Sequence, residues 1–192
     1  REWAMSKPTT PWVDGLTIGQ VLAVTTRRHA DREAMVFPQL GRRWTWRQFA
    51  ADVDAAARGL IAMGIQKGEH VALWATNVPE WVLLQFATAR IGAVLFNINP
   101  AYRAFELEYV LNQSDSVALF LVDQFKTSNY FDMLREVCPE LSQAAGGKIS
   151  SPKFPKLRNV VTVKGDPPAG LMTWQQMIDA GRKTDPAKLD EI

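Results

Sequence analysis

The chain has 192 residues, of which 47% are hydrophobic and 22% are charged, and its formal net charge is +2. These values are typical of a globular protein with one sizeable core, and the scattered basic residues give no reason to expect nucleic acid. The only cysteine, Cys138, excludes an internal disulfide bond and fits a reducing compartment, so we expect a cytoplasmic protein. The first residues contain no apolar leader, and Arg1 in place of a starting Met indicates a trimmed or excised chain.

Hydrophobic periodicity and helix-start signals divide the chain into alternating helices and strands. Three predicted helices begin after a Thr that precedes a Gln by three positions, the spacing of a capping box: Thr17, Thr45 and Thr173. The predicted helices are 18–29, 46–63, 79–91, 105–113, 128–137 and 174–180. The predicted strands are 34–37, 43–45, 71–74, 94–97, 118–122 and 160–163.

The most apolar stretch, 81–98, has nearly the length of a membrane span, but it contains Arg90 and is interrupted by Gly92. Before Gly92 the apolar residues repeat at helical spacing and predict one buried helix face: Trp81, Leu84, Ala87 and Ile91. After Gly92 the run "AVLFN" predicts a buried strand. Asn77 is a candidate N-cap for the helix. We therefore interpret the stretch as half of a strand–helix–strand unit and not as a membrane span.

The alternation of helices and buried strands from residue 45 to residue 137 predicts an α/β fold. We expect a mostly parallel sheet flanked by helices on both faces, with a short antiparallel hairpin formed by strands 34–37 and 43–45. The chain is interpreted as one α/β subdomain. Its core is 17–141, its Gly/Ser/Pro-rich loop 142–156, its last strand and helix 157–181, and its loose tail 182–192.

The residues themselves predict no catalytic residue and no metal site. His29 and His70 are isolated from each other and from Cys138, and we expect His70 to face solvent at a strand end. The turn after strand 71–74 has no glycine to approach a pyrophosphate, and "GGKIS" at 146–150 lacks the first Gly and the Ser or Thr of a phosphate loop.

The order of several phrases nevertheless resembles the N-terminal region of acyl-CoA synthetases, which are AMP-forming, adenylate-forming ligases. The most specific phrases are "NVPEWV", "ARIGAV" and "NINPAYRAFELEYVL", and the resemblance extends from about Thr17 to Trp174. It is closest to the medium- and long-chain fatty acyl branch.

The resemblance implies that a fatty acid or other carboxylic acid reacts with Mg·ATP to give an acyl-adenylate, from which coenzyme A displaces AMP. In the family the phosphates are held by a Gly-rich loop ending in Pro-Lys-Gly, a Tyr-Gly-x-Thr-Glu motif, a ribose-binding Asp and a C-terminal Lys, and none of these occurs in the 192 residues. We therefore expect an N-terminal fragment that is inactive alone and binds neither ATP, Mg²⁺ nor coenzyme A tightly.

The resemblance also implies that two loops lie near the coenzyme A nucleotide in the complete enzyme. They are "NINPAYR" and "DQFKTSNY", which offer Asn99, Arg103 and Lys126. Both loops follow predicted parallel strands, and such sheets bind ligands at the carboxyl ends of their strands. Ordinary solvated loop cations are the alternative interpretation.

Two other functions compete with the ligase fragment. One is a stand-alone, non-catalytic interaction or dimerisation module, and the other is a dinucleotide-dependent oxidoreductase, which the missing glycine fingerprint disfavours. We expect no transmembrane segment, although peripheral membrane contact remains open. We also expect self-association through apolar surface that a missing subdomain would cover.

Overall fold

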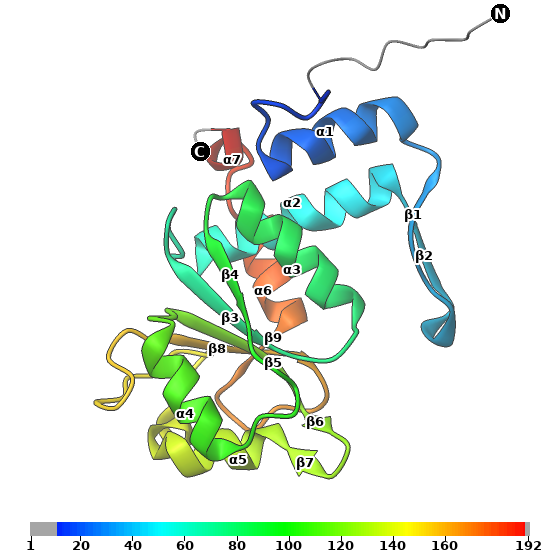
Figure 1. Ribbon diagram of the computed structural model, residues 1–192. Coiled ribbons are helices and arrows are strands. Elements are labelled where there is room, and N and C mark those ends of the chain that lie inside the picture. The colour runs from blue at the N-terminus through cyan, green and yellow to red at the C-terminus, as the bar shows by residue number, and fades with distance from the viewer. Residues whose placement is uncertain (1–10, 191–192) are drawn as a thin grey trace, which may run out of the picture.

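The computed structural model describes residues 11–190, and a five-stranded parallel sheet forms its centre (Figure 1). In spatial order the strands are β4 (Val94–Asn97), β3 (His70–Trp74), β5 (Ala118–Val122), β8 (Asn159–Lys164) and β9 (Met172–Thr173). Every residue of β5 is buried, as expected for a parallel strand covered on both faces.

Helices cover the sheet in two layers, as Figure 1 shows. One layer consists of α2 (Trp46–Ala62), α3 (Pro79–Arg90) and α6 (Trp174–Arg182), and the other of α4 (Ala104–Gln113) and α5 (Tyr130–Val137). Outside the first layer, α1 (Ile18–His29) packs on α2 and α3. The predicted α/β class, with helices on both faces of a parallel sheet, is confirmed.

The predicted antiparallel hairpin is also confirmed. Strands β1 (Glu33–Phe37) and β2 (Arg42–Thr45) pair with each other, and the 3-10 turn η1 (Pro38–Leu40) joins them. The hairpin projects beside α2, away from the central sheet (Figure 1). It belongs to a small second core, whose buried members are Leu22, Trp44, Phe49, Val53 and Leu83.

The three capping boxes predicted from the Thr–Gln spacing are all present, at Thr17, Thr45 and Thr173. In each box the Thr hydroxyl accepts a hydrogen bond from the Gln backbone N–H, and the Gln side chain accepts one from the Thr backbone N–H. The predicted cap of α3 is wrong. Val78 occupies the N-cap position, and Asn77 makes no capping hydrogen bond.

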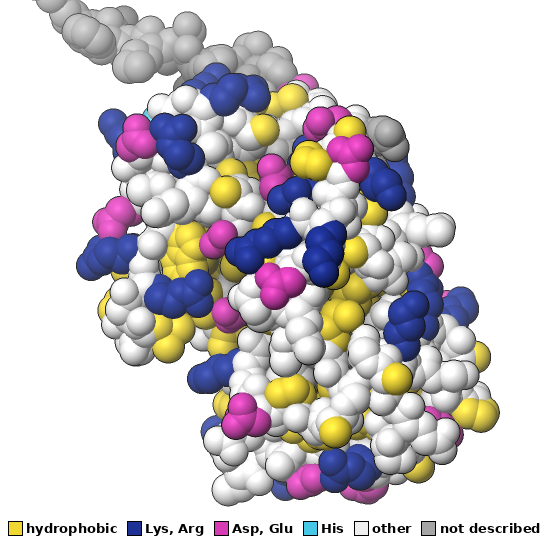
Figure 2. All heavy atoms as spheres, turned by 180° about the vertical axis from the view of Figure 1, so that it is seen from behind, with side chains coloured by type: hydrophobic (Ala, Val, Ile, Leu, Met, Phe, Trp, Pro, Cys, Tyr) yellow, Lys and Arg dark blue, Asp and Glu magenta, His cyan; other side chains and the backbone are white. Residues whose placement is uncertain are grey.

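The apolar stretch 81–98 is divided as predicted, into α3 and β4. Gly92 lies between them with φ of +69°, a left-handed conformation that ends the helix at little cost to glycine. Among residues 11–190, no helix combines the length and apolarity needed to cross a membrane. On the face shown in Figure 2, basic and acidic side chains are interspersed among apolar ones.

One side chain of the predicted α3 face is less buried than expected. Leu84, Ala87 and Ile91 are buried, but Trp81 is only partly buried. The helix has a second buried side, which includes Leu83, because it also packs against α1 and the small second core.

Two short strands and the start of α5 differ from the sequence prediction in the segment that follows β5. The strands β6 (Gln124–Phe125) and β7 (Ser128–Asn129) form a small hairpin, so α5 begins two residues later than predicted. The Asn129 side chain caps α5 by accepting a hydrogen bond from the Asp132 N–H. Strands of two residues have too few positions to show a periodic pattern, which is why the sequence did not reveal them.

The two segments expected to be irregular are partly ordered. The 3-10 turn η2 (Pro139–Gln143) extends into the predicted loop 142–156, and Phe154 within that loop is buried. Within the expected loose tail, α7 (Ala187–Asp190) forms and buries Leu189. Arg90 of α3 donates a hydrogen bond of 3.1 Å to the Leu189 carbonyl and lies 3.5 Å from the Asp190 carboxylate, so two long-range contacts hold this turn.

The crossing of α2 and α6 gives a first stability prediction. A Cβ added to Gly181 would lie 2.5 Å from the Gly59 backbone N and 2.7 Å from the Ala55 carbonyl O. We expect Gly181→Ala to lower the free energy of unfolding by roughly 1–3 kcal/mol, because a helix backbone must shift. Gly19→Ala is the matched control in α1, where the nearest atom would be Arg90 Cδ at 3.4 Å. Urea denaturation of both variants is the measurement, and a Gly181→Ala protein as stable as wild type would contradict the prediction.

The two tryptophans of the β3–α3 unit give a second prediction. Trp74 is fully buried, whereas Trp81 is partly exposed. Trp74→Ala should therefore cost roughly 3–5 kcal/mol, and Trp81→Ala clearly less, roughly 1–3 kcal/mol. Denaturant midpoints rank the two variants, and the reverse order would mean that the Trp81 face is the better packed one.

Candidate functional site

The carboxyl ends of the parallel strands lie at one edge of the sheet, where an aromatic pair supports the loops. Trp74 at the end of β3 stacks on Tyr130 at the start of α5, with ring centroids 3.5 Å apart and planes inclined by 2°. The Tyr130 hydroxyl donates a hydrogen bond of 2.6 Å to the Pro100 carbonyl, and Trp74 Nε1 donates one of 3.2 Å to the Asn99 carbonyl. Burial raises the pKa of Tyr130 to about 12, so its hydroxyl stays a donor at neutral pH. The loop after β4 is therefore fixed by two hydrogen bonds from buried aromatic side chains to its backbone carbonyls.

The residues that the resemblance placed near coenzyme A lie on this supported edge. Asn99 Oδ1 accepts a hydrogen bond of 2.9 Å from the Ala101 N–H, which fixes the turn after β4. Arg103 donates a hydrogen bond to the Ser128 hydroxyl and so joins the start of α4 to the β6–β7 hairpin. Lys126 is at the tip of that hairpin, with φ of +52°.

All three predicted residues are exposed, and their side chains make no direct bond to one another. The structure thus brings the Arg103 loop and the Lys126 hairpin together through Ser128. The Lys126 ammonium lies over the Phe125 ring, 5.3 Å from its centre, and the residue remains exposed. Two exposed cations beside a fixed turn are suited to contact phosphate groups.

A cavity of about 660 Å³ opens elsewhere at the carboxyl ends, between the β1–β2 hairpin and the first turns of α3. We call it the hairpin trough. Most of its lining is apolar, and its charged lining residues are Glu80 and Lys164. Neither the trough nor Lys164 was singled out by the sequence, because its two walls come from segments about 40 residues apart.

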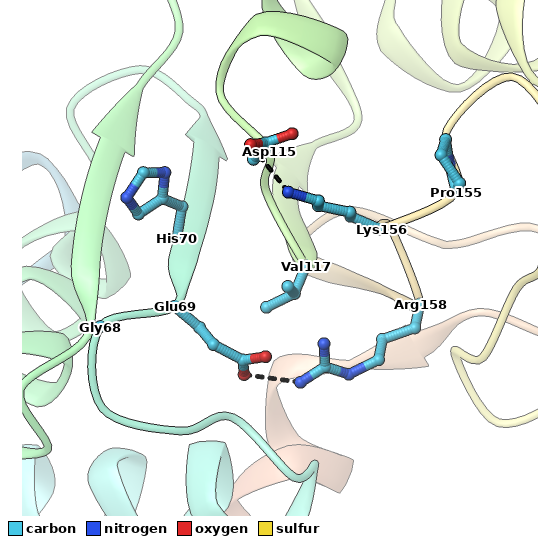
Figure 3. A pocket seen from close by; sticks show the side chains of 8 residues that line it. All are labelled: Gly68, Glu69, His70, Asp115, Val117, Pro155, Lys156 and Arg158. Carbon is cyan, nitrogen blue, oxygen red and sulfur yellow. Dashed lines mark hydrogen bonds and ion pairs between the residues drawn. The ribbon is translucent and has the colours of Figure 1, made fainter.

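The opposite edge of the sheet also has a hollow, of about 530 Å³, formed by the amino ends of β3, β5 and β8 (Figure 3). Two ion pairs cross it. Arg158 bonds Glu69 at 2.6 Å, and Lys156 lies 2.8 Å from Asp115. The charges of this edge are therefore already neutralised by partners, and we assign it a structural role.

His70 lies at the same edge and corrects a sequence expectation. We expected its side chain to face solvent, but it is partly buried, and its Nδ1 lies 2.6 Å from the Ser114 carbonyl O. The contact joins β3 to the turn before β5. In Figure 3 the imidazole points away from the Glu69–Arg158 pair.

The described residues offer neither a metal-binding cluster nor an accessible thiol. Within residues 11–190, no group of three His, Cys, Asp or Glu side chains is arranged to hold a metal ion. Cys138 is buried, with Sγ 3.5 Å from Glu140 Oε2, and burial raises the pKa of its thiol. A buried thiol with a raised pKa is a poor nucleophile.

The architecture is an α/β domain that presents two exposed cations and a largely apolar cavity at the carboxyl ends of its parallel strands. A family model described as AMP-binding enzyme matches residues 22–189, so the chain belongs to this family. The chain is 40% identical over 165 residues to the medium-chain acyl-CoA ligase ACSF2, mitochondrial, of Homo sapiens, covering 86% of this chain and 27% of the relative. The Danio rerio protein of the same name is 38% identical over 192 residues, covering 96% and 32%.

A solved structure shows the same fold. Acetoacetyl-CoA synthetase from Streptomyces lividans superposes with a TM-score of 0.67 at 22% identity, covering 85% of this chain and 25% of that one. The chain thus corresponds to the N-terminal region of an acyl-CoA synthetase or ligase, and it spans about a third or less of the length of the two named relatives.

The Glu69–Arg158 pair gives a third prediction. The hydrogen bond from Arg158 lowers the pKa of Glu69 in the folded state below its ordinary value of 4.5. The stability that the pair contributes is therefore complete above about pH 4.5 and is lost as the pH falls through the lower, folded pKa. Glu69→Gln should cost up to about 1 kcal/mol at pH 7, because the pair is partly exposed.

The measurement is urea denaturation of wild type and Glu69→Gln between pH 7 and pH 3, where the two proteins should converge. Arg158→Met and the double variant complete the cycle, which separates the pair from the second Arg158 bond, to the Gly64 carbonyl. A difference that grows toward low pH would contradict the assignment.

Proposed function

We propose that the chain is the N-terminal portion of a fatty acyl-CoA synthetase, which converts a carboxylic acid, ATP and coenzyme A into acyl-CoA, AMP and pyrophosphate. The observation that carries this proposal is the family match over residues 22–189, together with about 40% identity to proteins named medium-chain acyl-CoA ligases. The fatty acyl class comes from those names and from the resemblance of the quoted phrases.

The reaction proceeds in two steps. A carboxylate oxygen attacks the α-phosphorus of ATP, and pyrophosphate leaves with the electron pair of the broken P–O bond. The sulfur of coenzyme A then attacks the acyl carbon, the thiol loses its proton, and AMP leaves. Bound Mg²⁺ supplies positive charge to the phosphates in the first step. The family's motifs for those phosphates do not occur in the 192 residues, so the chain's own contribution is the scaffold and the carboxyl-edge loops.

Coenzyme A is the cofactor that this chain's residues fit. Arg103 and Lys126 are exposed cations on neighbouring loops, and the turn at Asn99 is fixed by its side chain and by Trp74. In this proposal the two cations hold phosphate groups of coenzyme A, and Asn99 orients the loop between them.

A second candidate function is a stand-alone, non-catalytic interaction or dimerisation module. It is favoured by two exposed aromatic side chains that are four residues apart on α4, Phe105 at 82% exposure and Tyr109 at 62%. Side chains at this spacing share a helix face, and exposed apolar surface tends to be covered by association. Sedimentation over a wide concentration range distinguishes self-association from a monomer.

The proposal also includes the cellular location of the protein. The buried, unpaired Cys138 supports a reducing, cytoplasmic location, with peripheral membrane contact left open. The names of the vertebrate relatives place those proteins in mitochondria.

The fourth prediction tests activity. The 192-residue chain with decanoate, ATP and Mg²⁺ should release no pyrophosphate above a protein-free control, because every phosphate-binding motif of the family is missing. A polypeptide that continues the reading frame through those motifs should form acyl-CoA. In that longer protein Arg103→Ala and Lys126→Ala should raise the KM for coenzyme A severalfold, while carboxylate-dependent ATP–pyrophosphate exchange stays at the wild-type level.

The control is Lys156→Ala, which removes a cation from the opposite edge of the sheet. An equal effect of this variant on the KM for coenzyme A would contradict the assignment of Arg103 and Lys126 to coenzyme A binding. Carboxylate-dependent pyrophosphate release by the 192-residue chain itself would show that the phosphate chemistry does not need the missing motifs.

A further inference from the structure

The seven residues 12–18, which lead into α1, expose four large apolar side chains. Trp12 is 57% exposed and Ile18 is 55% exposed, and Val13 and Leu16 are 39% and 38% exposed. Within residues 11–190 only five other large apolar side chains are exposed, and they are divided among the β1–β2 hairpin, β4 and α4. Apolar side chains that are exposed together, rather than singly, indicate a contact surface.

The segment before α1 runs back along the helix. The Leu16 N–H donates a hydrogen bond of 3.1 Å to the Val13 carbonyl, which closes a turn. The guanidinium of Arg28, in the last turn of α1, lies 5.4 Å from the centre of the Trp12 ring. The exposed apolar side chains therefore extend from the start of α1 toward its basic end. Figure 1 shows α1 at the outside of the layer that contains α2 and α3.

The charge beside these apolar residues is positive. Three exposed arginines lie in or just after the last turn of α1: Arg27, Arg28 and Arg32. Asp31 is paired with Arg47 at 3.0 Å, so Asp14 is the one carboxylate among the described residues 11–32 that has no ion pair. Cations at this end also suit the helix dipole, but the dipole does not account for the exposed apolar residues. We call the three arginines and the four apolar residues the α1 surface.

Apolar side chains beside unpaired cations match a surface in which an anionic layer covers an apolar one, and a leaflet with anionic phospholipids is such a surface. A tryptophan ring suits the depth of the headgroups, and an arginine can lay its stem against apolar groups while its charge meets phosphate. We propose that the α1 surface binds reversibly to membranes that contain anionic phospholipids. The apolar residues then lie at the headgroup boundary, and the arginines contact lipid phosphates.

A lipid surface fits the α1 surface better than a protein partner does. A specific protein interface needs a large area with close shape complementarity. Side chains that project from a short turn offer little of either, whereas a fluid leaflet adapts to their shape. A few apolar side chains and three cations supply two weak signals, which together give reversible rather than permanent binding.

The direct test is co-sedimentation of the 192-residue chain with lipid vesicles, without ATP or coenzyme A. We expect binding to phosphatidylcholine vesicles that contain about 30% phosphatidylglycerol, and little binding to phosphatidylcholine alone. The bound fraction should fall as salt is raised from roughly 50 to 500 mM, because salt screens exposed charges. Equal binding to both kinds of vesicle, or binding to neither, would overturn the proposal.

Two sets of variants separate the charges from the apolar residues. Arg27→Gln with Arg28→Gln should lower the partition coefficient about 25-fold, because each cation near an anionic leaflet contributes about fivefold, and the same positions changed to Lys should bind as wild type does. Trp12→Ser should lower the partition coefficient by roughly tenfold, because an aromatic ring leaves the boundary. Circular dichroism establishes that each variant is folded, and Leu16→Ser replaces Trp12→Ser if it is not.

The matched controls change the same chemistry on other elements. Lys126→Gln with Lys148→Gln removes two exposed cations, and Phe105→Ala removes an exposed aromatic ring from α4. Both should bind vesicles as wild type does. Equal losses in the controls would mean that binding does not use the α1 surface and would overturn the proposal.

The place of Trp12 in the lipid gives a separate readout. Trp12→Phe keeps an apolar ring, so the variant should still bind. Quenching of tryptophan fluorescence by lipids that are brominated in their acyl chains should be strong in wild type and largely lost in Trp12→Phe. Quenching that persists in this variant would place another tryptophan at the membrane and contradict the proposal.

This inference does not use the proposed function. Vesicle binding is measured without any catalytic step, whereas the proposed function is tested by product formation in the longer protein. Failure to bind anionic vesicles beside an active longer ligase would refute this inference alone. Vesicle binding by a chain whose longer form makes no acyl-CoA would refute only the ligase.

Discussion

The structure depends on a parallel sheet that must be covered on both faces. All five residues of β5 are buried, and so are four of the five in β3. Exposing such strands would place large apolar areas in water, so the chain supplies helices above and below after nearly every strand. Within the helix layer, α2 and α6 pack closely because Gly59 and Gly181 let their backbones come into contact. With both faces covered by helices, the sheet itself is open at the amino and carboxyl ends of its strands, where the hollow and the trough lie.

The two edges have different physical chemistry. At the amino edge the charges are paired across the hollow, and His70 is tied to the Ser114 carbonyl. At the carboxyl edge the interior supports the loops instead, because the stacked rings of Trp74 and Tyr130 hold the turn at Asn99 through its backbone. Arg103 and Lys126 are exposed on these loops, where Arg103 donates to the neutral Ser128 hydroxyl and Lys126 lies over the Phe125 ring. A rigid base below exposed cations is the arrangement that preorganises a binding loop.

Local signals explain which parts of the fold were predictable. Thr45 and Gln48 are three residues apart, so the start of α2 is determined by a short phrase, and the run from Ala118 to Val122 is apolar throughout. The strands β6, β7 and β9 have two residues each and show no pattern. The partial exposure of Trp81 was also hidden, because it depends on how the hairpin and α1 pack against α3.

The candidate site likewise has one part that the sequence predicted and another that it did not. Asn99, Arg103 and Lys126 were assigned to the carboxyl edge because they follow parallel strands, a rule of topology that the sequence alone can apply. The bond from Arg103 to Ser128 joins positions 25 residues apart, and only the folded chain reveals it. The hairpin trough was even less accessible to prediction, since the hairpin, α3 and Lys164 meet only in three dimensions.

The carboxyl edge offers two kinds of surface, which are formed by different elements. The loops that follow β4 and β5 present Arg103 and Lys126, cations that suit the phosphates of a nucleotide-containing thiol. The trough beside α3 presents a mostly apolar lining and the exposed Lys164. Strand β3, ending in Trp74, leads into α3 on one side and supports the Asn99 turn on the other. The same buried strand thus positions both surfaces, so a cavity at Trp74 would disturb the Asn99 turn and the start of α3 together.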